Sequence, residues 1–396
     1  MAAMTRRERL MATLRGEPVD RPAVNFYEIG GWKLNPDDPD PFNVYNGPGW
    51  RDLIQLAEAE TDLIRMLHPT RTPTPENCRD EFFKVDTYNP CEGVRTLFAE
   101  TFTRVPHRSR FTRTTLTVAG RTMTALTRHD PDVATVWTVE HLLKDADDAR
   151  AYLQLPDAVF AYESDLAPLI AEDAALGDAG IVMVDVADPL CAVAGLFSLA
   201  DYTVLALTEP ALFHQLLEQQ ARHIYPLVEH AAREFPGHLW RVVGSEYASE
   251  PLLPPRLYEE YVVRYTKPMV DTIQKYGGFA RIHSHGRLRR ILHYIAAMQP
   301  AGLDPVEPPP QGDMHLSEVR REIGAQTVLF GNIEASEIEL LPPDAFAVRV
   351  QQALREGTGG KGRGFVLMPS SCPYGREISA RVMANYETMV RLTRDN

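Results

Sequence analysis

The stretch Gly278-Phe279-Ala280-Arg281-Ile282-His283-Ser284-His285-Gly286 joins an apolar run to a histidine pair and a closing glycine. A basic amphipathic run follows at residues 288–298, so the pattern predicts a strand, a tight exit and a helix. Side chains alternate along a strand, so His283 and His285 are expected on one face, where two imidazoles could bind a metal ion. The chain has 12 histidines, so a single pair of this kind also arises by chance.

Strand and helix patterns alternate on both sides of this stretch. The strand patterns lie at residues 22–29, 61–67, 181–186, 238–244, 278–285, 302–307, 327–333 and 364–368. About eight strands separated by helices in one long chain predict an α/β fold of the (β/α)8 TIM-type barrel class, with its site on the loops after the strands. A doubly wound open sheet is the alternative. No Gly-x-Gly-x-x-Gly follows the first strand, which disfavours a dinucleotide-binding version of that sheet.

Residues from about 80 to 140 interrupt the alternation. Polar and apolar residues alternate with period two at 114–118 and 121–126, on either side of a turn at Val118-Ala119-Gly120-Arg121. This pattern predicts an inserted antiparallel β-ribbon with its connector, within a single barrel domain that spans residues 1–396. We expect the ribbon to pack at the rim of the barrel.

The composition restricts the class of partner. The formal net charge is -13, which disfavours nucleic acid and anionic membranes because both repel an acidic surface. Apolar runs are too short to span a bilayer, and the first residues predict a charged helix rather than a signal peptide. The four cysteines form no Cys-x-x-Cys motif, so we expect a reducing, cytoplasmic location.

Polar side chains follow several predicted strands, and the carboxyl ends of strands converge in a barrel. Glu246, the pair His283 and His285, and Cys372 come from three such ends. Together they offer nitrogen, oxygen and sulfur ligands that suit zinc. Glu246 could be a fourth ligand or a base beside the metal. Cys372 is the weakest member, because lone cysteines are usually buried fillers.

Two further features allow more than one interpretation. Arg281 has the same strand parity as the histidines, so an inward position would require a carboxylate partner or an anionic substrate. The glycine-rich segment at residues 357–364 suggests a phosphate-binding loop, but it lacks the Gly-Lys-Ser/Thr ending and precedes a strand. We therefore interpret it as a connector on the stability face of the barrel.

Segments at both ends of the chain are similar to a known family. Residues 6–9 with 15–22, and residues 302–314 with 329–334, resemble the uroporphyrinogen decarboxylase superfamily, which implies a (β/α)8 barrel. True decarboxylases carry an arginine-rich segment, with a Met-Arg-Gln-Ala-Gly-Arg-Tyr run, that holds an acidic porphyrinogen. The matching residues 25–32 contain no arginine and include Glu28.

The chain is more similar to the cobalamin-dependent methyltransferase branch of that superfamily. These enzymes hold zinc with a His-x-Cys on one strand and a cysteine on a later one. His283 matches the first ligand, His285 replaces the cysteine of the pair, and Cys372 lies where the last cysteine is expected.

The resemblance implies a zinc-dependent methyltransferase that moves a methyl group between a small methylated substrate or thiol and a corrinoid. No Asp-x-His-x-x-Gly carrier motif is present, so the corrinoid is expected on a separate partner protein. The site residues expected besides the metal ligands are Glu246, Tyr27 and Arg376 for catalysis, and Glu28, Asn332, Tyr374 and Glu307 for the substrate.

Two alternatives remain open. The chain could be a decarboxylase or lyase of the same superfamily acting on another small carboxylate, with Arg281 and Arg376 holding the acid. It could also be a barrel that binds a ligand without catalysis. Metal content separates the methyltransferase from the other two.

Overall fold

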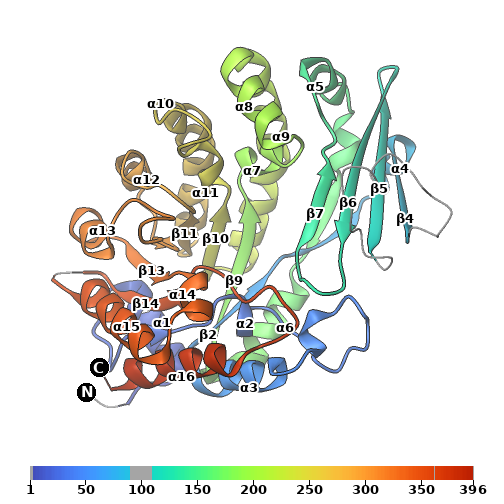
Figure 1. The fold of residues 1–396 in the computed structure, drawn as a ribbon. Coiled ribbons are helices and arrows are strands. Elements are labelled where there is room, and N and C mark those ends of the chain that lie inside the picture. The colour runs from blue at the N-terminus through green and yellow to red at the C-terminus, as the bar shows by residue number, and fades with distance from the viewer. Residues whose placement is uncertain (1–2, 90–108, 361, 396) are drawn as a thin grey trace.

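A computed structural model describes residues 3–89, 109–360 and 362–395. Its central sheet has eight parallel strands in the order β1-β14-β13-β12-β11-β10-β9-β2. They are β1 (Ala23–Val24), β2 (Leu63–Leu67), β9 (Gly180–Ala187), β10 (Leu239–Val243), β11 (Phe279–His283), β12 (Gly302–Asp304), β13 (Val328–Ile333) and β14 (Phe365–Pro369). Asp62 links the two end strands, because its amide donates to Val24 O at 2.7 Å and its carboxylate accepts from Val24 N at 2.9 Å. The predicted barrel is confirmed (Figure 1).

Helices surround the curled sheet (Figure 1). The longer ones are α1 (Arg6–Arg15), α3 (Trp50–Glu60), α6 (Ala167–Leu176), α8 (Leu199–Thr208), α9 (Pro210–Glu234), α11 (Arg264–Lys275), α15 (Pro343–Thr358) and α16 (Ala380–Arg394). The shorter ones are α2 (Glu28–Gly31), α4 (Arg79–Phe82), α5 (Ala146–Tyr152), α7 (Pro189–Ala194), α10 (Arg256–Tyr258), α12 (Leu292–Met298), α13 (Leu316–Glu322) and α14 (Ala335–Leu340).

Two separate apolar cores result from the alternation of strand side chains. The larger core lies between the strands and the surrounding helices. The smaller core fills the barrel itself with alternate strand residues, among them Met66, Met183 and Phe330, and it also contains Leu10 and Leu14 of α1. Helix α1 therefore packs against the barrel interior.

Buried ion pairs of the first residues of the chain hold helix α1 against the barrel. Arg9 on α1 pairs with Asp20 at 2.7 Å and with Asp62 at 2.6 Å, and Arg21 pairs with Asp62 at 2.9 Å. The N-terminal residues that carry the family resemblance therefore have a structural role. They join α1, β1 and β2.

A four-stranded antiparallel sheet stands beside the barrel, which confirms the predicted ribbon (Figure 1). Its strands are β4 (Phe83–Tyr88), β5 (Arg110–Val118), β6 (Arg121–His129) and β7 (Val136–Glu140). Ala119 and Gly120 connect β5 to β6 with φ values of 50° and 75°, as a tight hairpin turn requires. Residues 90–108 of the predicted ribbon lie outside the described residues. A further pair, β3 (Thr70–Pro73) and β8 (Tyr162–Asp165), is also antiparallel.

Three predicted boundaries differ from the structure. The first strand is limited to β1, and Tyr27 near its predicted end has a φ of 57°, which is incompatible with a strand. Strand β11 ends at His283, so His285 lies beyond the ladder. The helix expected at residues 288–298 begins at Leu292, because the amides of Leu288 and Arg289 donate to the side chain of Asp313 instead.

Candidate functional site

Charged side chains meet inside the barrel at the carboxyl ends of β9 to β12. In the parallel register, Arg241 lies beside Asp185 on one neighbour and Arg281 on the other. His283 lies beside Asp304 in the same way. A row of polar groups from four strands therefore replaces the apolar filling of the barrel near this end.

His283 is held by a fully buried carboxylate. Its Nδ1 lies 2.8 Å from Oδ2 of Asp304, and the other oxygen of Asp304 lies 2.9 Å from Nε of Arg281. Arg281 and Asp304 have no exposed surface, and their close contact is not aligned as a hydrogen bond. Burial would raise the pKa of Asp304, but Arg281 and then His283 outweigh it and lower that pKa. Arg281 therefore has the carboxylate partner that its buried position requires.

His285 is held by a second carboxylate. Its Nδ1 lies 2.9 Å from Glu307 Oε1, and Gly286 N donates to Glu307 Oε2 at 2.7 Å. Burial would lower the pKa of His285, but the hydrogen bond and charge of Glu307 raise it. The two imidazole rings lie edge to face with centroids 4.5 Å apart. Although His285 lies past the strand, the pair is together as the sequence predicts.

Both carboxylates engage Nδ1, so each imidazole keeps Nε2 for another partner. Within the described part of the chain, no hydrogen bond to either Nε2 is found. A carboxylate on Nδ1 fixes the ring orientation and the tautomer, which is the usual support for a histidine that binds a metal or a substrate through Nε2.

Tyr27 lies beside His283. The two rings are stacked with centroids 6.2 Å apart. Arg241 donates from Nη1 to the hydroxyl of Tyr27 and forms a two-point ion pair with Asp185, at 2.6 Å and 3.1 Å. Burial raises the pKa of Tyr27, and the charge of Asp304 raises it further. The phenol is therefore neutral at physiological pH.

The other two predicted metal ligands are placed differently. Glu246 follows β10 in a short 3-10 helix, Ser245–Ala248, accepts from Gly244 N at 3.3 Å, and its charge contributes to the raised pKa of His285. Cys372 is buried, and its amide donates to Glu28 at 3.2 Å. Burial, followed by the charge of Glu28, raises the pKa of the Cys372 thiol well above its usual value.

The four predicted ligands do not form a preassembled metal site. Within residues 3–89, 109–360 and 362–395, no group of three or more His, Cys, Asp or Glu side chains is arranged to hold a metal ion. A thiol must lose its proton to bind zinc, and the surroundings of Cys372 oppose that loss. The two histidines are the part of the predicted set that the structure brings together.

The remaining predicted site residues contact groups other than the histidine pair. Asn332 is buried and accepts from Arg349 at 3.1 Å, and Tyr374 is half exposed with its hydroxyl 3.0 Å from Ser371. Arg376 donates to the carbonyls of Pro41, Asn43 and Pro131 and to the side chain of Asn46. Its guanidinium therefore fastens surface loops together, and the expected catalytic role of Arg376 has no contact that supports it.

Three residues in this region were not assigned to the site from sequence. Asp304 and Arg241 orient His283 and Tyr27, and His68 contacts Asp185 O at 2.9 Å and stacks on Trp32. A polar residue inside an otherwise apolar strand is the signal that could have identified Arg241 and Asp304. Their partners depend on strand register, which the sequence pattern does not give.

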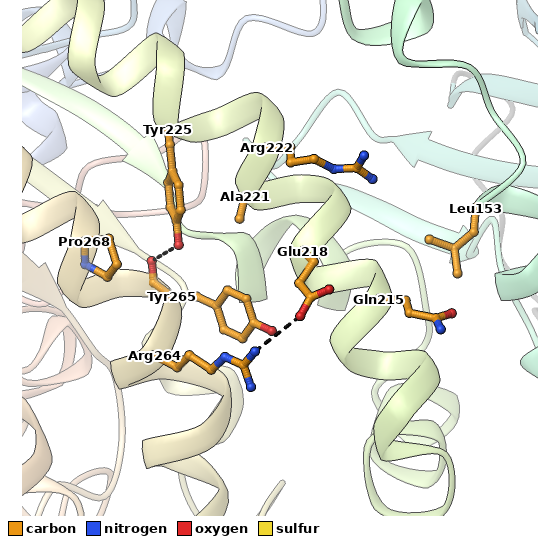
Figure 2. A pocket seen from close by; sticks show the side chains of 9 residues that line it. All are labelled: Leu153, Gln215, Glu218, Ala221, Arg222, Tyr225, Arg264, Tyr265 and Pro268. Atoms are coloured by element: carbon orange, nitrogen blue, oxygen red, sulfur yellow. Dashed lines mark hydrogen bonds and ion pairs between the residues drawn. The ribbon is translucent and has the colours of Figure 1, made fainter.

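A hollow of about 790 Å³ lies elsewhere, between α9 and α11 (Figure 2). Its lining includes Tyr225, Tyr265 and Arg264, where Tyr225 donates to the carbonyl of Tyr265 and Arg264 pairs with Glu218 (Figure 2). None of the predicted site residues lines it. We therefore locate the candidate site by its convergent ionisable groups at the strand ends rather than by this outer hollow.

The sequence matches the family model described as uroporphyrinogen decarboxylase (URO-D) over residues 175–378. That segment includes β9 to β14 and covers more than half of the chain. The chain belongs to the uroporphyrinogen decarboxylase family. This family segment contains both histidines, the two carboxylates that hold them, and Cys372.

A solved structure shares the fold of the chain. A methyltransferase from Methanosarcina mazei superposes with a TM-score of 0.58 at 14% sequence identity, covering 99% of each chain. At this identity the likeness concerns the fold. A D-psicose 3-epimerase in the presence of D-fructose gives a TM-score of 0.34 at 8% identity, over 61% of this chain and 84% of that one. No curated protein sequence matched the chain. No helix among the described residues is long and apolar enough to cross a membrane.

Proposed function

We propose that this member of the uroporphyrinogen decarboxylase family is a methyltransferase. It would move a methyl group between a small methylated substrate or thiol and a corrinoid carried by a separate protein, with zinc bound by His283 and His285. The observation that carries the proposal is the pair of adjacent imidazoles, each bound through Nδ1 to its own carboxylate. The pair lies at the carboxyl ends of the barrel strands, and the catalytic groups of such barrels lie at this end.

The donor set of the two histidines fits zinc. Zinc prefers imidazole nitrogen, and its histidine ligands are commonly fixed by a carboxylate on the other ring nitrogen. The third protein ligand is open, with Glu246 the better candidate because its carboxylate lies close enough to His285 to raise the pKa of that imidazole. Cys372 would need to lose a proton that burial and Glu28 retain. Zinc held there would supply a Lewis acid that polarises a thiol or a methoxy or methylthio group.

The residues of the chain have separable tasks in this proposal. Asp304 and Glu307 keep Nδ1 of the histidines protonated and leave Nε2 available. Arg281 keeps Asp304 ionised in a buried place. The neutral hydroxyl of Tyr27, oriented by Arg241, is available to donate a hydrogen bond to a substrate heteroatom. A small neutral substrate suits this set, since each arginine in it is already paired with an aspartate.

The lyase alternative requires arginines that are free to hold a carboxylate. Arg281 is paired with Asp304 and has no exposed surface, and Arg376 donates to loop oxygens. These contacts favour methyl transfer over the decarboxylase or lyase reading. Porphyrinogen binding is disfavoured for a separate reason, because Glu28 occupies the segment where true decarboxylases carry arginines.

Elemental analysis combined with a methyl-transfer assay tests the proposal. The full chain, purified without chelators, is expected to contain stoichiometric zinc and to consume methylcobalamin in the presence of an alkyl thiol, followed by the change in visible absorbance. His285→Ala should remove both properties. His293→Ala, an exposed histidine in the same part of the chain, is the matched control and should keep both.

A chain that contains no divalent metal, and that binds none when zinc is offered, would overturn the zinc assignment. Zinc binding without methyl transfer from methylcobalamin, either to a thiol or in the reverse direction, would leave a metal-binding barrel and reject the methyltransferase.

A further inference from the structure

A second hollow, of about 520 Å³, lies at the face of the barrel where the strands begin, opposite the face that carries the histidine pair. It is bounded by the end of α1, by the segment that enters β1, and by residues 357–358 and 362–364, which precede β14. The lining residues are Thr13, Gly16, Glu17, Pro18, Val19, Asp20, Arg21, Pro22, Arg320, Gly357, Thr358, Gly362, Arg363, Gly364 and Phe365. None of the predicted site residues belongs to this set.

Arg320 lines this hollow as a buried cation, and no acidic side chain among the described residues pairs with it. Its side chain donates to the carbonyls of Gly324, Gly357 and Gly364, and the residue is 6% exposed. Its Nε has no hydrogen-bond partner in the described chain, and no carboxylate of that part of the chain forms an ion pair with it. Burial lowers the pKa of Arg320 to about 10, which reflects a charge that no anion stabilises.

Arg363 is the second cation of the hollow. Its Nε and Nη2 donate to Leu14 O at 3.0 Å and 2.8 Å, and its Nη1 donates to Gln326 O at 3.1 Å. Among the ion pairs of the described residues, none includes Arg363. Carbonyl oxygens at helix ends carry only partial negative charge, so they satisfy the donors of these arginines without neutralising them.

The other charges of the hollow are already matched, apart from one glutamate. Asp20 pairs with Arg9, and Arg21 pairs with Asp62. Of the lining residues, this leaves Arg320 and Arg363 against the exposed Glu17. A local excess of positive charge is unexpected in a chain whose net charge is -13.

Gly362 lies directly on one of these cations. A Cβ added to Gly362 would lie 2.3 Å from Nη1 of Arg320, so a larger residue here would displace the guanidinium. The hollow is large enough for a small phosphate compound, and the positive charge of a guanidinium group stabilises phosphate through charge-assisted hydrogen bonds. We propose that this hollow binds a phosphate-bearing anion through Arg320 and Arg363, at the face opposite the histidine pair.

Calorimetric titration of the full chain with pyrophosphate, at constant ionic strength, tests this site. We expect saturable binding at one site per chain. Arg363→Gln should weaken it at least about tenfold, as loss of a charge-assisted contact does. Arg289→Gln removes a half-exposed arginine that is paired with Glu318, and serves as the matched control with unchanged affinity.

A third variant separates this hollow from the candidate active site. His283→Ala should bind pyrophosphate as the wild type does, because His283 lies at the carboxyl ends of the strands and the hollow lies at the opposite face. Absence of saturable binding, unchanged affinity in a folded Arg363→Gln, or loss of binding in His283→Ala would each overturn the proposal. Inorganic phosphate and a nucleoside diphosphate, titrated in parallel, identify which phosphate compound the hollow prefers.

Discussion

His283 and Asp304 are direct neighbours on adjacent parallel strands, and Nδ1 of the imidazole lies 2.8 Å from Oδ2 of the carboxylate. The same carboxylate faces Arg281 with its other oxygen. One buried aspartate therefore neutralises a cation in the barrel and orients the histidine at its mouth. Stability and the orientation of His283 are coupled at this residue.

Asp304→Asn should reduce the free energy of unfolding by about 3–5 kcal/mol, because it leaves the Arg281 charge buried without a counterion. Urea unfolding at neutral pH measures the loss. Glu307→Gln is the comparison, since it affects a partner, His285, whose side chain is 40% exposed, and should cost about 1 kcal/mol or less. Equal losses in the two variants would contradict the buried-pair argument.

His283→Ala and His285→Ala should each remove most of the bound zinc while circular dichroism stays that of the folded barrel, because neither side chain belongs to the apolar cores. Cys372→Ser should keep most of the metal, since the thiol is held protonated near Glu28. Elemental analysis of the three variants measures how much zinc each one retains. A larger metal loss in Cys372→Ser than in the histidine variants would assign Cys372 as a principal ligand.

The chain should not convert uroporphyrinogen to coproporphyrinogen. The segment at residues 25–32 has Glu28 and no arginine, so the acidic side chains of the substrate would be repelled there. Chromatography of the porphyrins after incubation measures this, with a true decarboxylase as the positive control. Turnover at ordinary enzyme rates would disprove the prediction.

Arg376→Ala should loosen the β4–β7 sheet from the barrel. The lost contacts join the loop after β14 to Pro131 and to residues 41–46, and their removal should cost about 2 kcal/mol of local stability. Limited proteolysis should then cut near residue 131 faster than in the wild type. Arg381→Ala, an exposed arginine nearby that donates to one carbonyl, should leave the rate unchanged.

Asp188→Asn should alter the pH dependence of stability. Burial raises the pKa of Asp188 to about 7, against the lowering effect of hydrogen bonds from Cys191 N and Thr266. The folded state therefore binds this proton more tightly than the unfolded state, whose aspartate pKa is about 3.9. The contribution of protonated Asp188 to the free energy of unfolding is fully present below about pH 4 and is lost as the pH rises to 7.

The difference in unfolding free energy between wild type and Asp188→Asn should accordingly fall between pH 4 and 7 and become constant above it. Urea unfolding at intervals over that range measures the difference. A pH-independent difference would show that Asp188 has the same pKa in both states.

The order of the strands and helices could be predicted from the sequence, because each element is indicated by a local pattern. Each strand of the barrel is an apolar run with its own flanking turn signals, so eight strands could be counted without knowing their neighbours. The ribbon was recognised for the same reason, from period-two alternation around Ala119 and Gly120. The histidine pair was also found, because its two members lie two residues apart.

Boundaries were less accurate where a distant side chain competes with the local pattern. The side chain of Asp313 accepts hydrogen bonds from the amides of Leu288 and Arg289, so α12 begins later than predicted. Asp313 is too distant in sequence for the local pattern around residue 288 to indicate it. Tyr27 leaves the strand conformation in a segment whose composition resembles a strand.

The partners of the site residues were decided only by the tertiary structure. Asp304 lies beside His283, and Arg241 beside Asp185 and Arg281, because parallel strands distant in sequence adopt one register around the barrel. The sequence by itself determined that an inward Arg281 needs an anion, from the cost of burying a charge. The packing of β11 against β12 decided that the anion is Asp304, because the pairing of these two strands brings both side chains together in the buried interior.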